Sequence, residues 1–156
     1  MSAPGDPTPP VSGFDAALRA ALLDRADALR LALSRADADG AATASTGLVG
    51  LGHGLTPSGD DVLTGCLLVL SMPGSGWSTP LALGDVAART NTVAAAMLQQ
   101  AGRGRFRQVL LDLTDALALG RDADRPARVV RDIGSSSGTD MLLGVRVGLA
   151  ALLARR

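Results

Sequence analysis

The chain has 156 residues, 47% of them hydrophobic, and a mean hydropathy of +0.25, which allows one domain with a hydrophobic core and excludes a disordered chain. Fifteen arginines balance fifteen aspartates, so the basic excess of a typical nucleic-acid-binding protein is absent. Aromatic residues contribute only 2%, and a core of Leu, Val and Ala suits close helix packing. The single cysteine excludes a disulfide within the chain and favours a cytoplasmic location.

Helical periodicity dominates the chain from residue 13 onward. Residues 1–12 are rich in Pro and Gly, lack the features of a signal peptide, and are predicted to form a flexible tail. No stretch alternates strictly between apolar and polar residues, so little or no sheet is expected. Residues 13–156 are therefore predicted to form a single all-α domain, a compact bundle of about six helices. The expected helices cover residues 14–38, 58–72, 79–101, 105–119, 126–133 and 138–154. No apolar run reaches the ~20 residues that a membrane span needs.

The central feature of the predicted helical domain is the segment from Gly47 to Leu70, GLVGLGHGLTPSGDDVLTGCLLVL. Four glycines within eight residues lead through Leu-Thr-Pro-Ser-Gly-Asp-Asp into an apolar run. Ser58 is a suitable helix N-cap, and Asp61 three residues later completes a capping-box pattern. The sequence therefore predicts a tight glycine-rich loop that ends at the N-terminus of a buried helix.

The same pattern occurs a second time, at Ser137-Gly138-Thr139-Asp140, again with a glycine four residues after the aspartate. One interpretation is that a good helix start is used twice and that Asp61 and Asp140 cap their own helices. The other is that two Gly/Ser-rich corners between loop and helix meet and line one site. We favour capping for the Ser and Asp positions taken alone, and a site for the loops as wholes.

Glycine-rich loops before helices often bind anions through free backbone N–H groups. Here Asp60 and Asp61 would repel a bare phosphate. Either a divalent cation such as Mg²⁺ lies between these aspartates and the ligand, or hydroxyl groups of the loops bind a polar ligand directly. The segment is not a P-loop, because the chain has no lysine, nor a dinucleotide fingerprint, because no strand precedes it.

Two further features leave alternatives open. His53, the only histidine, lies between two glycines and is either a general base or, as we favour, a surface residue without a role. Thr90-Asn91-Thr92 interrupts the expected helix 79–101 with three poor helix formers, which marks either a site or threonines bonded to the preceding turn with Asn91 facing solvent.

The segment Gly50 to Asp61, GLGHGLTPSGDD, resembles the GLGxGLTPSGDD signature of a family once described as a domain of unknown function and linked to a subunit of oxamate carbamoyltransferase in allantoin breakdown. The stretches 90–106 and 135–144 follow in the expected order, and the resemblance covers roughly residues 47–153. Family members usually carry a further N-terminal portion, so this chain is expected to be a short member. At position 53 relatives often have Pro, whereas this chain has His.

The resemblance implies a cytoplasmic bacterial protein of purine catabolism that binds a small anion such as carbamoyl phosphate or oxamate. Transfer would proceed by attack on the carbamoyl carbon, helped by positioning and charge stabilisation. Asp60 and Asp61 are the candidate catalytic residues and the candidate ligands of a Mg²⁺ ion. The candidate ligand-binding residues are Gly52, Gly54, Thr56, Ser58, Gly59, Asn91, Ser136, Ser137, Gly138 and Asp140.

Three functional hypotheses remain at this point. A carbamoyltransferase-like subunit, active alone, as a homo-oligomer or with a partner subunit, predicts a polar pocket where the two corners converge, with Asp60 pointing into it. A non-catalytic subunit-interaction module predicts aspartates bonded to their own helix N–H groups. A magnesium-dependent hydrolase of a phosphorylated or ribosylated substrate fits only the acidic loops.

Overall fold

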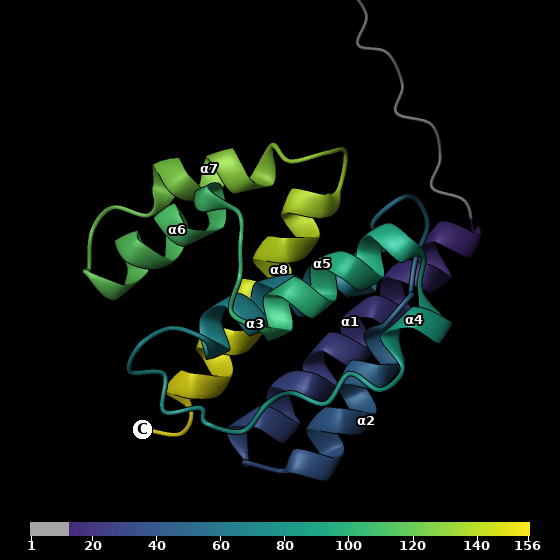
Figure 1. Cartoon of the computed structure of the whole chain (residues 1–156), viewed down its shortest axis with the longest axis horizontal. Coiled ribbons are helices and arrows are strands. Elements are labelled where there is room, and N and C mark those ends of the chain that lie inside the picture. Colours follow the sequence, from purple (N-terminus) through teal and green to yellow (C-terminus); the bar gives the residue numbers. More distant parts are fainter. Residues whose placement is uncertain (1–12) are drawn as a thin grey trace, which may run out of the picture.

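The computed structural model describes residues 13–156, and the predicted tail at residues 1–12 and the proposed N-cap Ser12 lie outside them. The described part is all-α, as predicted, with eight helices and no strand (Figure 1). The helices are α1 (Gly13–Ser34), α2 (Ala38–Leu48), α3 (Ser58–Leu70), α4 (Val86–Arg89), α5 (Thr92–Gly102), α6 (Gln108–Ala118), α7 (Asp124–Arg131) and α8 (Ser137–Leu153).

Two helices were not anticipated. Residues 41–46, expected to form a loop, belong to α2, whose N-cap Asp37 accepts a hydrogen bond from the backbone N–H of Gly40. The small residues there form a helix because Ala41, Ser45 and Leu48 repeat at helical spacing and are buried. The expected helix 79–101 is also wrong, since the structure has the four-residue α4 and the separate α5 in its place.

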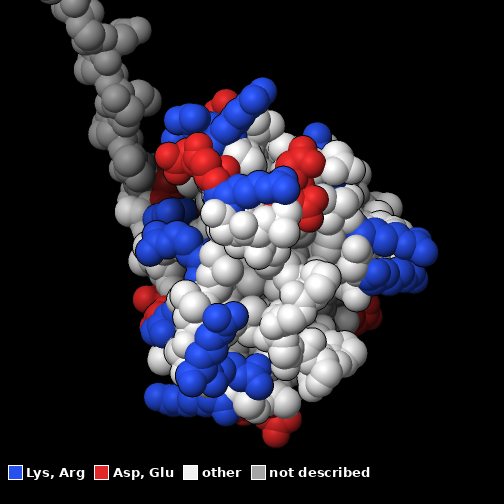
Figure 2. All heavy atoms as spheres, turned by 90° about the vertical axis from the view of Figure 1, so that its left-hand side faces the viewer, with Lys and Arg blue, Asp and Glu red and all other residues white. Residues whose placement is uncertain are grey.

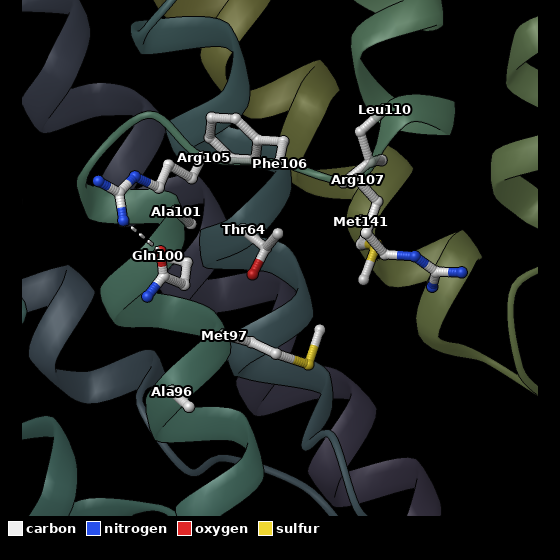
Figure 3. A pocket seen from close by; sticks show the side chains of 10 residues that line it. All are labelled: Thr64, Ala96, Met97, Gln100, Ala101, Arg105, Phe106, Arg107, Leu110 and Met141. Atoms are coloured by element: carbon white, nitrogen blue, oxygen red, sulfur yellow. Dashed lines mark hydrogen bonds between the residues drawn. The ribbon is translucent and has the colours of Figure 1, made fainter.

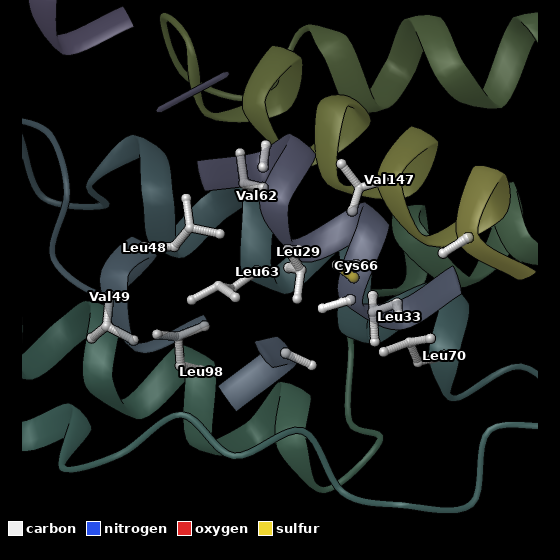
Figure 4. Packing of buried hydrophobic residues seen from close by; sticks show 14 of the residues in the cluster. Leu29, Leu33, Leu48, Val49, Val62, Leu63, Cys66, Leu70, Leu98 and Val147 are labelled. Carbon is white, nitrogen blue, oxygen red and sulfur yellow. The ribbon is translucent and has the colours of Figure 1, made fainter. Parts of the chain in front are cut away.

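Helices α3 and α8 form the centre of the molecule, and the other helices lie around them (Figure 1). All of α3 after Ser58 is buried. Helices α1 and α2 pack together on one side, and α6 and α7 on the other. The main core joins α1, α2, α3, α5 and α8 through aliphatic side chains such as Leu29, Leu63 and Leu98 (Figure 4). Phe14, at the start of α1, is 65% exposed although its spacing places it on the apolar face of that helix.

Glycines allow α3 and α8 to approach at the level of their backbones. A Cβ atom at Gly65 would lie 1.9 Å from the carbonyl oxygen of Met141, and a Cβ at Gly144 would lie 1.9 Å from that of Val62. Gly148, one turn later, faces Val69. Residues later in α3 contact residues later in α8, so the two helices run parallel. The internal sequence repeat thus produces a pair of helices with reciprocal contacts, and both helices begin at the same end.

Charged residues are dispersed over the surface. The ends of α3, α6 and α8 lie toward the left of Figure 1, and Figure 2 views that side: uncharged atoms occupy its middle, and Arg and Asp side chains surround them. No continuous basic stripe crosses this face. Among residues 13–156, no helix is both long enough and apolar enough to cross a membrane.

Candidate functional site

The two Ser-Gly-x-Asp corners meet in the structure. The hydroxyl groups of Thr56, in the glycine-rich loop, and Ser137, at the start of α8, form a hydrogen bond of 2.8 Å. Because α3 and α8 are parallel, the positive ends of both helix dipoles face the same place. The convergence that the sequence repeat suggested is therefore real, although 81 residues separate the two hydroxyls.

The capping interpretation of the repeated Ser and Asp is wrong. Helix α3 has Pro57 as its N-cap and α8 has Ser136, and neither residue makes a side-chain capping hydrogen bond. Ser58 and Ser137 are the first residues inside their helices. The aspartates at the fourth helical position are therefore available for contacts other than capping.

Asp60 ties the start of α3 to two other segments. Its carboxylate accepts a hydrogen bond of 2.8 Å from the backbone N–H of Gly50 and one of 2.5 Å from the hydroxyl of Thr90. Burial raises the pKa of Asp60, and these two hydrogen bonds act in the opposite direction. Both oxygens are thus engaged within the fold, so Asp60 positions the loop, whereas we expected its carboxylate to point into an open pocket.

Asp61 lies beneath the junction of the two corners and is only 1% exposed. Its Oδ2 atom has no hydrogen-bond partner among residues 13–156. Burial raises the pKa of Asp61 to about 7; the hydroxyls of Ser137 and Thr56 lower it, and the negative charges of Asp140 and Asp60 raise it further. At neutral pH this carboxyl group is therefore poised between its charged form and a protonated form that can donate a hydrogen bond.

Asp140 is the counterpart of Asp61 in the second corner, and its charge is paired. A guanidinium nitrogen of Arg19, in α1, lies 3.1 Å from its carboxylate. The aspartate is buried while the arginine is half exposed, with 51% of its side chain accessible. No sequence signal links Arg19 to a residue 121 positions away.

The Thr90-Asn91-Thr92 segment supports the same loop. Asn91 is the N-cap of α5, since its Oδ1 accepts from the N–H of Ala94, and its amide donates to the carbonyl of Leu55 at 2.9 Å. Thr90 reaches Asp60, as described above. The three polar residues end one helix and start the next, and Thr90 and Asn91 hold the glycine-rich loop in place. The expectation that Thr90 bonds to its preceding turn is therefore wrong, while a ligand-binding role of Asn91 stays a prediction.

The glycines predicted to contact a ligand fall into two groups. Gly52 and Gly54 have φ angles of +122° and +86°, which glycine adopts at low cost, and they shape the loop above α3. Gly59 and Gly138 are buried, and a Cβ atom on either would lie about 2 Å from a backbone carbonyl oxygen of α2 or α7. Their N–H groups also donate within the fold, to the carbonyls of Leu51 and Ile133. The structure thus gives these two glycines a packing role.

The remaining candidates lie at the edge of the junction. Ser58 is partly buried and Ser136 is exposed. His53 is exposed, and its ring lies 5.2 Å from that of Phe14. Across residues 13–156, no three His, Cys, Asp or Glu side chains gather in a way that could hold a metal ion. A magnesium site formed by Asp60 and Asp61 stays a prediction.

Comparison with known proteins assigns the chain to a family. A family model described as "Oxamate carbamoyltransferase subunit AllH" matches residues 48–149, a range that includes the glycine-rich loop, α3 and most of α8. No solved structure matches the chain. Because the match covers more than half of the chain and contains both corners, the resemblance seen in the sequence is confirmed. The chain belongs to the family of oxamate carbamoyltransferase subunit AllH.

Proposed function

We propose that this chain is a subunit of a carbamoyltransferase and that it binds a small anionic metabolite, such as carbamoyl phosphate or oxamate, where the N-termini of α3 and α8 meet. The observation that carries the proposal is the pair of parallel helix starts without side-chain caps, joined by the hydrogen bond between Thr56 and Ser137. Two such N-termini favour an anion by the positive ends of their dipoles.

The three aspartates near this junction do not prevent an anion from binding. The charge of Asp140 is compensated by Arg19, and that of Asp60 is stabilised by two hydrogen-bond donors on the far side of the loop. Asp61 has a pKa of about 7, so its protonated form can donate to an oxygen of the ligand. The site can therefore accept a negative ligand without a metal ion between the charges.

The chemistry suited to this geometry is stabilisation and positioning. The hydroxyls of Thr56 and Ser137 and the positive ends of the two helix dipoles would hold the anion, and the carboxyl group of Asp61 would supply or take up a proton as charge develops on it. Membership of a subunit family indicates that a partner protein takes part. Carbamoyl transfer would then require the second subunit to complete the site or to bind the acceptor.

Calorimetric titration with carbamoyl phosphate, and separately with oxamate, tests the proposal. We expect saturable binding that becomes about five- to tenfold weaker in Ser137→Ala, because one hydrogen bond to a charged ligand is lost. Ser135→Ala is the matched control, since Ser135 is exposed and precedes the helix start. Binding that needs magnesium would place a metal between the aspartates and would replace the direct contacts proposed above. Absence of binding, or equal binding by both variants, would refute the anion site and favour a non-catalytic interaction module.

A further inference from the structure

A second site is suggested by a cavity of about 490 Å³ on the side of α3 that faces α5 and α6. Ten residues from α3, α5, α6, α8 and the segment before α6 line it (Figure 3). They are Thr64, Ala96, Met97, Gln100, Ala101, Arg105, Phe106, Arg107, Leu110 and Met141. None of them belongs to the candidate anion site, although Thr64 lies only one turn further along α3 than Asp60.

The walls of this cavity are apolar. Leu110 and Met141 are at most 2% exposed and lie at its inner side, and Phe106 and Met97 are only partly buried beside the opening. Figure 3 shows the side chains of Met97, Met141 and Phe106 around one common space. A volume of this size is typical of pockets for small organic ligands, and methionine side chains adapt to ligands of irregular shape. The cavity therefore suits the apolar body of a small molecule.

The edge of the cavity is positive. Arg105 lies on the α5 side and Arg107 on the opposite side, beside α8, and both side chains are exposed and point outward from the cavity (Figure 3). Arg105 donates a long hydrogen bond of 3.3 Å to the side-chain amide oxygen of Gln100, a neutral group. Neither arginine pairs with a carboxylate within residues 13–156, and no acidic residue lines the cavity. Arg107 is also the N-cap of α6, a helix start without a side-chain cap, which adds a partial positive charge.

We propose that this cavity binds an amphipathic carboxylic acid, with its hydrocarbon body against Phe106, Leu110 and Met141 and its carboxylate at the edge of the cavity, where the exposed side chains of Arg105 and Arg107 can turn toward it. Arginine is well suited to such a head group, because its guanidinium group can donate two parallel hydrogen bonds to one carboxylate. The ligand differs from carbamoyl phosphate and oxamate, which have no hydrocarbon body to bury. The chain thus carries a binding site separate from the one where α3 and α8 begin.

Calorimetric titration of the whole chain with octanoate tests this site, with octylamine and octanol as ligands of the same tail but opposite or no charge. We expect octanoate to bind at least about tenfold more tightly than octanol, and octylamine not to bind, because only the carboxylate matches the two arginines. Failure of octanoate to bind would overturn the proposal. Equal affinity for octanol would overturn it as well, and would assign the cavity to an apolar side chain of a protein partner.

Variants locate the binding. Arg107→Gln is expected to weaken octanoate binding about five- to tenfold, whereas Arg103→Gln, the same change at an exposed neighbour outside the cavity, leaves it unchanged. Ala96→Trp fills the cavity from an exposed position on α5 and is expected to abolish binding while far-UV circular dichroism stays that of the wild type. Retained binding in Ala96→Trp would overturn the location. Titration of the same variant with carbamoyl phosphate separates the two proposals, because that ligand does not use the cavity.

Discussion

Replacing Asp61 by Asn tests whether the buried carboxyl group at the junction of α3 and α8 has the pKa inferred from its surroundings. The substitution keeps the shape of the side chain but removes its ability to ionise. In the wild type the folded chain retains on Asp61 a proton that the unfolded chain releases near pH 3.8. The folded pKa is raised to about 7, so increasing the pH from about 4 to about 7 lowers the free energy of unfolding.

The size of the effect follows from the two pKa values. The difference between about 7 and 3.8 corresponds to about 4 kcal/mol. About two of these pH units lie above pH 5, so the wild type should lose about 2–3 kcal/mol between about pH 5 and about pH 8 that Asp61→Asn does not lose.

Urea unfolding at these two pH values, followed by circular dichroism, measures the effect. The quantity to compare is the change in unfolding free energy with pH, because any cost of burying the amide of Asn is the same at both pH values. Asp132→Asn is the control, since Asp132 is exposed and should follow the wild type. If Asp61→Asn follows the wild type as well, Asp61 ionises normally in the fold, and the assignment of a proton donor at the junction fails.

Two further substitutions test the packing and the polar contacts around this site. Gly144→Ala should lower the free energy of unfolding by about 3 kcal/mol or more, because its Cβ would lie 1.9 Å from a carbonyl oxygen of α3. Gly102→Ala, in open space at the end of α5, should leave thermal unfolding nearly unchanged, and equal effects of the two would contradict the close approach. Thr90→Val should cost about 1–3 kcal/mol in urea unfolding, because buried Asp60 loses a donor. The same change at exposed Thr92 should cost little, and a harmless Thr90→Val would show that the contact with Asp60 contributes nothing.

The sequence was sufficient for the fold class and for the main helices. Apolar residues at helical spacing predicted α1, α3, α6 and α8 within a few residues of their observed ends. The sequence did not predict α2, because a run of Ala, Ser and Thr shows only a weak hydrophobic periodicity. This helix is stabilised by its packing against α1. The prediction also failed at Asn91, where a polar residue inside an expected helix is the N-cap of a new one.

The repeated Ser-Gly-x-Asp motif was sufficient to predict two helices that start with the same residues and carry a glycine at the same position. The signature around the first motif was sufficient to identify the family. Tertiary structure alone decided what the aspartates do. Asp60 accepts hydrogen bonds from Gly50 and Thr90, and Asp140 forms an ion pair with Arg19. One carboxylate oxygen of Asp61 has no hydrogen-bond partner within residues 13–156. Sequence spacing fixes which residues share a helix turn. The contacts of these aspartates join segments 10 to 121 positions apart, so they depend on how the helices and loops pack, and local sequence does not encode that arrangement.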